Sequence, residues 1–226
     1  MEILRNCKRT EFDSRIQYYH FINTCCDAHL FNDKTGSFSL SRDGNCLYKV
    51  YNEKVVREKQ LNIDNILTSE DVLDSSYLFP RELFLDRDFL LGLKVRYYGG
   101  SFLNENNNRG SLDIKTLSIA YDEFLEDTDE LSNQNIYIPS LDGLLLCNGT
   151  DLIVYDTCSF IKNPKNIERL DKIGSIRDAN REVAFKAIKE GLLSYSGDKY
   201  ITYLDNDRVL FDYLKEKHGR VLKKHR

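Results

Sequence analysis

Short runs of residues that favour β-strands dominate the first hundred positions of the chain. They lie at residues 37–40, 45–51, 82–85 and 90–98. A polar turn at residues 86–88 separates the last two runs, so they are predicted to form a hairpin. Apolar residues at mixed helical spacing predict a helix over residues 54–67. The first part of the chain is therefore predicted to be β-rich with one helix.

After Gly99-Gly100 the apolar residues recur mainly every three or four positions, which predicts helices over residues 112–128, 177–193 and 207–222. Two apolar runs, residues 144–147 and 152–155, interrupt this pattern on either side of Asn148-Gly149. An Asn-Gly pair favours a tight hairpin turn because both residues tolerate positive φ. We therefore expect an α+β chain with a β-rich part over residues 1–98. The α-rich part over residues 99–226 would contain a hairpin near residues 144–155.

Composition is typical of a globular protein and narrows the classes of function. Among 226 residues, 41% are hydrophobic and 30% are charged, which argues against wholesale disorder. No apolar run approaches the roughly 18 residues that span a bilayer, and residues 1–6 lack the apolar core of a signal peptide. The six cysteines form no C-x-x-C pair, so they predict free thiols. We expect a cytoplasmic protein that does not bind a membrane.

The charge distribution gives little reason to expect nucleic-acid binding. The formal net charge is −4 and the pI is about 5.7, so no general attraction to phosphate backbones exists. Residues 215–226 are basic, but cations also stabilise the negative end of a helix dipole, and this interpretation is favoured. A partner, if there is one, is expected to be another protein.

Three segments carry candidate chemistry, and their order is informative. Residues 35–39 (Thr-Gly-Ser-Phe-Ser) contain Gly36, the next strand carries Lys49 in its interior, and Asp156 follows the second strand of the Asn-Gly hairpin. With the intervening helix, hairpin, Gly-Gly pair and long helix, this order resembles the two-lobed protein kinase fold in a small, divergent bacterial-type form. The resemblance covers roughly residues 30–165. It implies a β-rich N-terminal lobe and a reduced, mainly α-helical C-terminal lobe.

The resemblance also implies roles for individual residues. In the family, the strand lysine binds the α and β phosphates of ATP, and this position matches Lys49. A carboxylate on the following helix holds that lysine, and Glu58 is the best-placed candidate. Gly36 falls in the loop that covers the phosphates. Asp156 falls at the position of the family's Mg²⁺ ligand, and backbone near residues 96–99 would bind adenine.

The match fails where the family carries its catalytic base and a metal-binding Asn. Counting back from Asp156 without a gap places Ile138 and Gly143 at these positions, and a one-residue deletion places Ser140 and Leu144 there. Neither alignment supplies both groups. Asp142 is the only carboxylate in this loop. It is a candidate displaced base or metal ligand, although an Asp-Gly pair before a strand more often forms a turn.

Two further differences from the kinase pattern also argue against catalysis. The phosphate-covering loop has a single glycine, and no Ala-Pro-Glu motif follows Asp156. We therefore expect a pseudokinase, a nucleotide-sensing or protein-interaction module that binds ATP with Mg²⁺ weakly or not at all.

Two alternatives stay open at this point. One is an active but atypical phospho- or nucleotidyl-transferase that uses Asp142 and Asp156 around a metal ion. The other is an α+β interaction protein unrelated to kinases, in which Lys49 is a solvated strand lysine and Asp156 a turn former. This last alternative predicts that Lys49 and Asp156 lie far apart, whereas the kinase-like interpretation requires them in one site.

Overall fold

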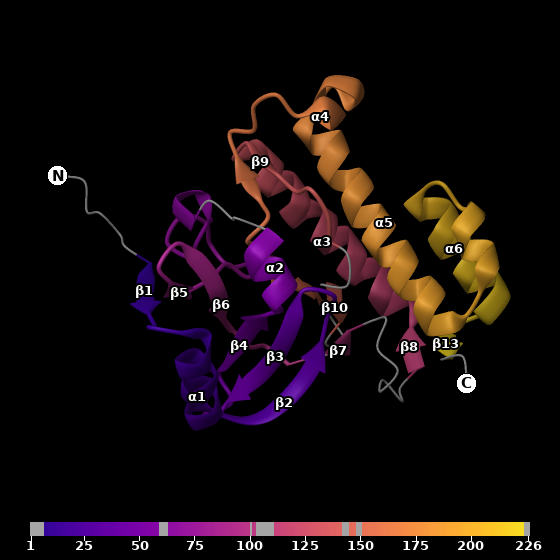
Figure 1. Ribbon diagram of the computed structural model, residues 1–226. Coiled ribbons are helices and arrows are strands. Elements are labelled where there is room, and N and C mark those ends of the chain that lie inside the picture. Colours follow the sequence, from indigo (N-terminus) through magenta and orange to yellow (C-terminus); the bar gives the residue numbers. More distant parts are fainter. Residues whose placement is uncertain are drawn as a thin grey trace. The chain divides into compact units, whose positions relative to one another are not determined.

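The computed structural model describes residues 7–58, 63–99, 101–102, 111–141, 145–147 and 151–223. The chain forms two compact units (Figure 1). The N-terminal unit comprises Met1–Tyr98 together with Tyr155–Phe160, and the C-terminal unit comprises Gly99–Val154 and Ile161–Arg226. Asp156 therefore belongs to the N-terminal unit although it lies far along the chain.

The N-terminal unit is built on one mixed sheet of six strands. In spatial order these are β1 (Lys8–Glu11), β5 (Glu82–Asp86), β6 (Phe89–Arg96), β4 (Cys46–Tyr51), β3 (Gly36–Ser41) and β2 (Cys26–Asn32). Only β1 and β5 pair in parallel, and all other neighbours are antiparallel. The four predicted strands and the predicted hairpin are confirmed, while β1 and β2 were not predicted.

Helix α1 (Arg15–Cys25) packs on one face of this sheet and was also missed. Its side chains Tyr18 and Ile22 are buried, in a core cluster with Tyr48, Val50, Phe84 and Leu91. Ser14 caps the helix by accepting a hydrogen bond from the N–H of Gln17. The helix has only two buried residues in eleven, so its apolar periodicity is too weak to identify it from the sequence.

Two predicted helices have different limits in the structure. In place of a helix over residues 54–67, the described residues form α2 (Glu53–Glu58) and a single 3₁₀ turn, η1 (Ile63–Asn65). The last predicted helix, α6 (Asp207–His218), ends where Gly219 takes a positive φ of 65°. The next residues form strand β13 (Val221–Lys223), which pairs with β8 (Ser111–Asp113).

The C-terminal unit is mainly helical. Helix α3 (Ile114–Asn133) and helix α5 (Ile176–Ser196) pack along each other, and α6 also contacts α3 (Figure 1). The shorter helices are α4 (Glu168–Ile173) and η2 (Lys199–Tyr203). The described helices include none that is both long enough and apolar enough to cross a membrane. The mixed α+β class, with a mainly β N-terminal sheet and a helical C-terminal part, is therefore confirmed.

Short strand pairs complete the C-terminal unit. Strands β10 (Leu145–Cys147) and β11 (Leu152–Val154) pair in antiparallel fashion, as predicted for the hairpin that precedes Asp156, and β7 (Ser101–Phe102) pairs with β10. The Asn148-Gly149 turn lies outside the described residues. Strand β9 (Ile136–Tyr137) pairs with β12 (Ile161–Lys162).

A buried amide on α5 holds the backbone that follows α3. The Asn180 side chain accepts a hydrogen bond from the N–H of Ile138 (2.8 Å) and donates to the carbonyl of Ile136 (2.8 Å) and the hydroxyl of Ser132 (2.9 Å). Asn180 is fully buried, so these contacts replace its hydration. They fix the backbone of residues 136–138 against α5.

The close approach of α1 to the sheet requires a glycine at position 92, which gives a first prediction. A Cβ at Gly92 would lie 2.0 Å from the Lys49 carbonyl oxygen and 2.2 Å from the Tyr18 hydroxyl, which donates to that same oxygen. We expect Gly92→Ala to lower the free energy of unfolding by about 3 kcal/mol, because it overpacks the core and breaks this hydrogen bond.

Gly44→Ala is the control. Its Cβ would meet nothing, and the positive φ of 72° costs only about 1 kcal/mol. Urea unfolding measures both, and equal losses would contradict the assignment.

Candidate functional site

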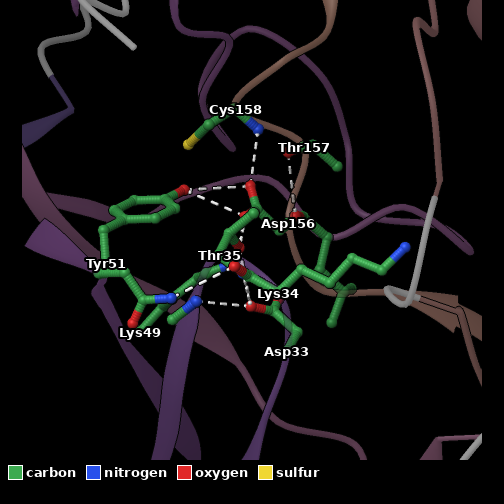
Figure 2. A network of polar contacts seen from close by, with 11 residues as sticks. Asp33, Lys34, Thr35, Lys49, Tyr51, Asp156, Thr157 and Cys158 are labelled. Carbon is green, nitrogen blue, oxygen red and sulfur yellow. Dashed lines mark hydrogen bonds and ion pairs between the residues drawn. The ribbon is translucent and has the colours of Figure 1, made fainter. Parts of the chain in front are cut away.

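The candidate site is centred on Lys49, which lies in the interior of β4. Its side chain is fully buried, so it is not the solvated strand lysine considered above. The ammonium donates to Asp33 Oδ2 (2.8 Å), to Thr35 Oγ1 (2.6 Å) and to Asp156 Oδ2 (Figure 2). An ammonium has three N–H donors, and each has an acceptor here.

Aromatic rings surround the same ammonium. Its nitrogen lies 4.7 Å from the centre of the Phe38 ring and 4.8 Å from the centre of the Tyr51 ring. Phe38 is directly opposite Lys49 in the β3–β4 pairing, so the strand register determines this contact. Cation–π contacts favour the charged form of the lysine where water is excluded.

Asp156 reaches the site from the segment that follows β11. Its Oδ1 accepts hydrogen bonds from the Tyr51 hydroxyl and from the N–H of Cys158, both at 3.1 Å. Its Oδ2 accepts from Lys49 and, at 3.2 Å, from Tyr51. The hydroxyl of the next residue, Thr157, donates to the Leu78 carbonyl (3.3 Å) and anchors the segment. Both carboxylate oxygens of Asp156 are therefore engaged by protein donors.

The third charged member, Asp33, was not among the predicted site residues. It lies in the turn between β2 and β3, and its Oδ1 accepts hydrogen bonds from Thr35 N (2.7 Å), Thr35 Oγ1 (2.8 Å) and Gly36 N (2.7 Å). The signal that was available is Asp-Lys-Thr-Gly before a strand, because an Asp side chain often binds the backbone N–H groups two and three residues later. No local signal indicates that its second oxygen binds Lys49.

The pKa values of Lys49 and Asp156 each depend on the charge of the other residue. Burial by itself would lower the pKa of Lys49, but the charges of Asp156 and Asp33 and their hydrogen bonds outweigh it, so the pKa is raised. Burial would likewise raise the pKa of Asp156, and the charge and hydrogen bond of Lys49, with those from Cys158 and Tyr51, bring it below the usual value. The site holds one cation and two carboxylates, an excess of one negative charge.

The structure brings together some of the predicted site residues. Lys49 and Asp156 are in direct contact, and Gly36 is next to them as the first residue of β3. Of the residues assigned to the phosphate-covering segment, 35–39, all but Thr35 lie in β3, which begins at Gly36 and pairs with β4. A Cβ at Gly36 would lie 2.1 Å from the Val50 carbonyl oxygen, so this strand contact itself requires glycine. Glu58 lies in α2, but its side chain, like Asp142, is outside the described part of the structure.

The residues of this arrangement do not fit a magnesium site. Mg²⁺ requires free carboxylate oxygens and water ligands in a regular octahedron. Both oxygens of Asp156 already accept hydrogen bonds, and a metal ion there would lie beside the Lys49 ammonium. In the described parts of the chain, His, Cys, Asp and Glu form no group of three or more that could hold a metal ion.

Comparison with protein-family models and with curated proteins finds no match for this chain.

The buried charges give a prediction of pH dependence. In the wild type, the lowered pKa of Asp156 contributes stability that is present above about pH 4 and is lost as the pH falls further. In Lys49→Met, Asp156 is buried without its cation, so desolvation raises its pKa and protonation favours the folded state. We expect the variant to lose about 3–5 kcal/mol at pH 7 and to become more stable, not less, as the pH falls toward 4.

Chemical unfolding at several pH values measures these curves. Lys34→Met is the matched control, because Lys34 is exposed and its ammonium points away from the network (Figure 2). It should keep the wild-type pH profile. Parallel profiles for Lys49→Met and the wild type would contradict the coupling.

Proposed function

We propose that the chain is a divergent kinase-like protein without ordinary phosphotransfer. In this proposal it is a pseudokinase that acts as an interaction module for another protein and binds ATP with Mg²⁺ weakly or not at all. The observation that carries the proposal is the contact between Lys49 and Asp156, which are 107 positions apart in the chain. They are the two residues that the resemblance to kinases assigns to one phosphate and metal site.

The order of elements supports the same proposal. Strands β3 and β4 with the buried lysine are followed by α2, the β5–β6 hairpin, the long helix α3 and the β10–β11 pair that leads to Asp156. This is the order on which the resemblance was based. Each element is common by itself, so the support comes from the order together with the ion pair.

The chemistry of the site supports the absence of phosphotransfer. Kinase catalysis needs a base for the substrate hydroxyl, metal ions on the phosphates and a lysine that is free to bind them. Ile138, at the base position in one alignment, is buried and apolar, and its N–H is bound by Asn180. Ser140, at that position in the other, has a hydroxyl whose pKa is too high to act as a base at neutral pH. Lys49 has no donor left for a phosphate.

The two alternatives are less well supported. An interaction protein unrelated to kinases predicts that Lys49 and Asp156 are far apart, and they are in contact. An atypical transferase would need Asp156 as a metal ligand, and its oxygens are occupied by Lys49, Tyr51 and Cys158.

The proposal predicts no transfer of label from ATP. Purified protein incubated with ATP labelled at the γ or the α phosphate, with Mg²⁺ and with Mn²⁺, should label neither itself nor a general acceptor protein. An active kinase in parallel is the control. Transfer from the γ position, abolished by Asp156→Asn, would identify an active kinase, and transfer from the α position would identify a nucleotidyltransferase.

Nucleotide binding itself is expected to be weak. With a dissociation constant of about 1 mM, about 2 mM ATP stabilises the fold by about 0.6 kcal/mol, which raises the melting temperature by about 1–2 °C. Lys49→Ala, measured at a pH at which it is folded, should abolish this rise, and Lys54→Ala, at an exposed position on α2, should retain it. A rise of more than about 8 °C would contradict a degenerate site.

A further inference from the structure

The turn between β2 and β3 gathers an unusual number of hydrogen-bond donors around one carboxylate. Asp33 receives two backbone N–H groups, from Thr35 and Gly36, and the Thr35 hydroxyl on one oxygen. Its other oxygen receives the Lys49 ammonium at 2.8 Å (Figure 2). The side chain of Asp33 is only 3% exposed, so these donors replace nearly all of its hydration.

This set of donors is of the kind that binds phosphate. Phosphate-binding loops use successive backbone N–H groups, a Ser or Thr hydroxyl and a lysine, because each donates to an oxygen that carries part of the anion's charge. We propose that Lys49 and the turn of residues 33–36 form a binding site for a phosphate-type anion, which the chain occupies with its own Asp33 carboxylate. The inference deepens the proposed function and rests on it for the choice of ATP as the natural anion.

The charge of the site explains why an external anion is excluded while Asp33 is in place. A phosphate that approached Lys49 would meet an excess of one negative charge in a buried environment, where repulsion is poorly screened. Asp33 is also covalently tethered beside its donors, so it competes at a high effective concentration. An external ligand binds only the fraction of molecules in which Asp33 has left, and its apparent affinity falls by that fraction.

A second aspartate, in another turn of the same sheet, shows which hydrogen bonds a turn-forming aspartate makes without a buried lysine. Asp43, between β3 and β4, accepts hydrogen bonds from the Ser41 hydroxyl (2.5 Å) and the N–H of Asn45 (3.1 Å). This is a similar local motif, but the Asp43 carboxylate is exposed and has no buried lysine as a partner in the network described above. Asp33 therefore differs from a turn-forming aspartate through its bond to Lys49.

The test is to remove the Asp33 carboxylate and to measure the binding of pyrophosphate, and separately of ATP, by isothermal titration. Asp33→Ala removes a charged group that competes with the anion for the Lys49 ammonium and the N–H groups of the turn. We expect Asp33→Ala to bind pyrophosphate about tenfold to a hundredfold more tightly than the wild type. Asp33→Asn should show a smaller gain, because the amide still occupies the turn without a negative charge.

Two controls and one rescue experiment make the result specific. Asp43→Ala should leave pyrophosphate affinity at the wild-type level, because it removes a turn aspartate that does not face Lys49. Adding Lys49→Ala to Asp33→Ala should remove the gain. If Asp33→Ala does not fold by itself, millimolar pyrophosphate should restore a cooperative melting transition, and circular dichroism will detect it.

The outcomes separate this inference from the proposed function. An unchanged pyrophosphate affinity in folded Asp33→Ala and Asp33→Asn, or a lack of rescue if they are unfolded, would overturn the self-occupied site. Tight pyrophosphate binding by the wild type would also overturn it. A gain for pyrophosphate without a gain for ATP would support the anion site and argue against a nucleotide as its ligand. Label transfer from ATP by the wild type would instead overturn the proposed function.

Discussion

The structure of the N-terminal unit depends on the burial of one positive charge. Moving an ammonium out of water costs several kcal/mol unless it is paired and fully hydrogen-bonded. Lys49 meets this requirement with two carboxylates, a hydroxyl and two aromatic rings. These groups come from β3, β4, the turn before β3 and the segment after β11. Each must therefore be in place for the others to be stable, which couples distant parts of the chain.

The same ion pairs limit what the site can do chemically. A lysine that binds phosphate must have free donors, and a carboxylate that binds a metal ion must have free oxygens. In this protein both sets are used for internal contacts. Lys49 and Asp156 therefore serve to hold the N-terminal unit together, and the buried network accounts for their presence there.

Much of the secondary structure could be predicted from the sequence because it depends on local periodicity. Strands β3 to β6 coincide with short runs of strand-favouring residues, and helices α3, α5 and α6 carry apolar residues at spacings of three and four. The elements that were missed, β1, α1 and β2, have mixed patterns, and their burial is decided by what packs on them. The end of α6 was also predicted incorrectly. The helical pattern continues to residue 222, but Gly219 takes a positive φ and ends the helix.

By itself, the sequence determined the α+β class and the order of most elements, and it identified Lys49 and Asp156 as candidate site residues. Only the tertiary structure decided that these two residues are in contact, that Lys49 is fully buried and that Asp33 is its second partner. The physical reason is the range of the interactions. Apolar periodicity and turn chemistry act over a few residues, whereas the partner of a buried charge is selected by packing between segments that are more than a hundred positions apart.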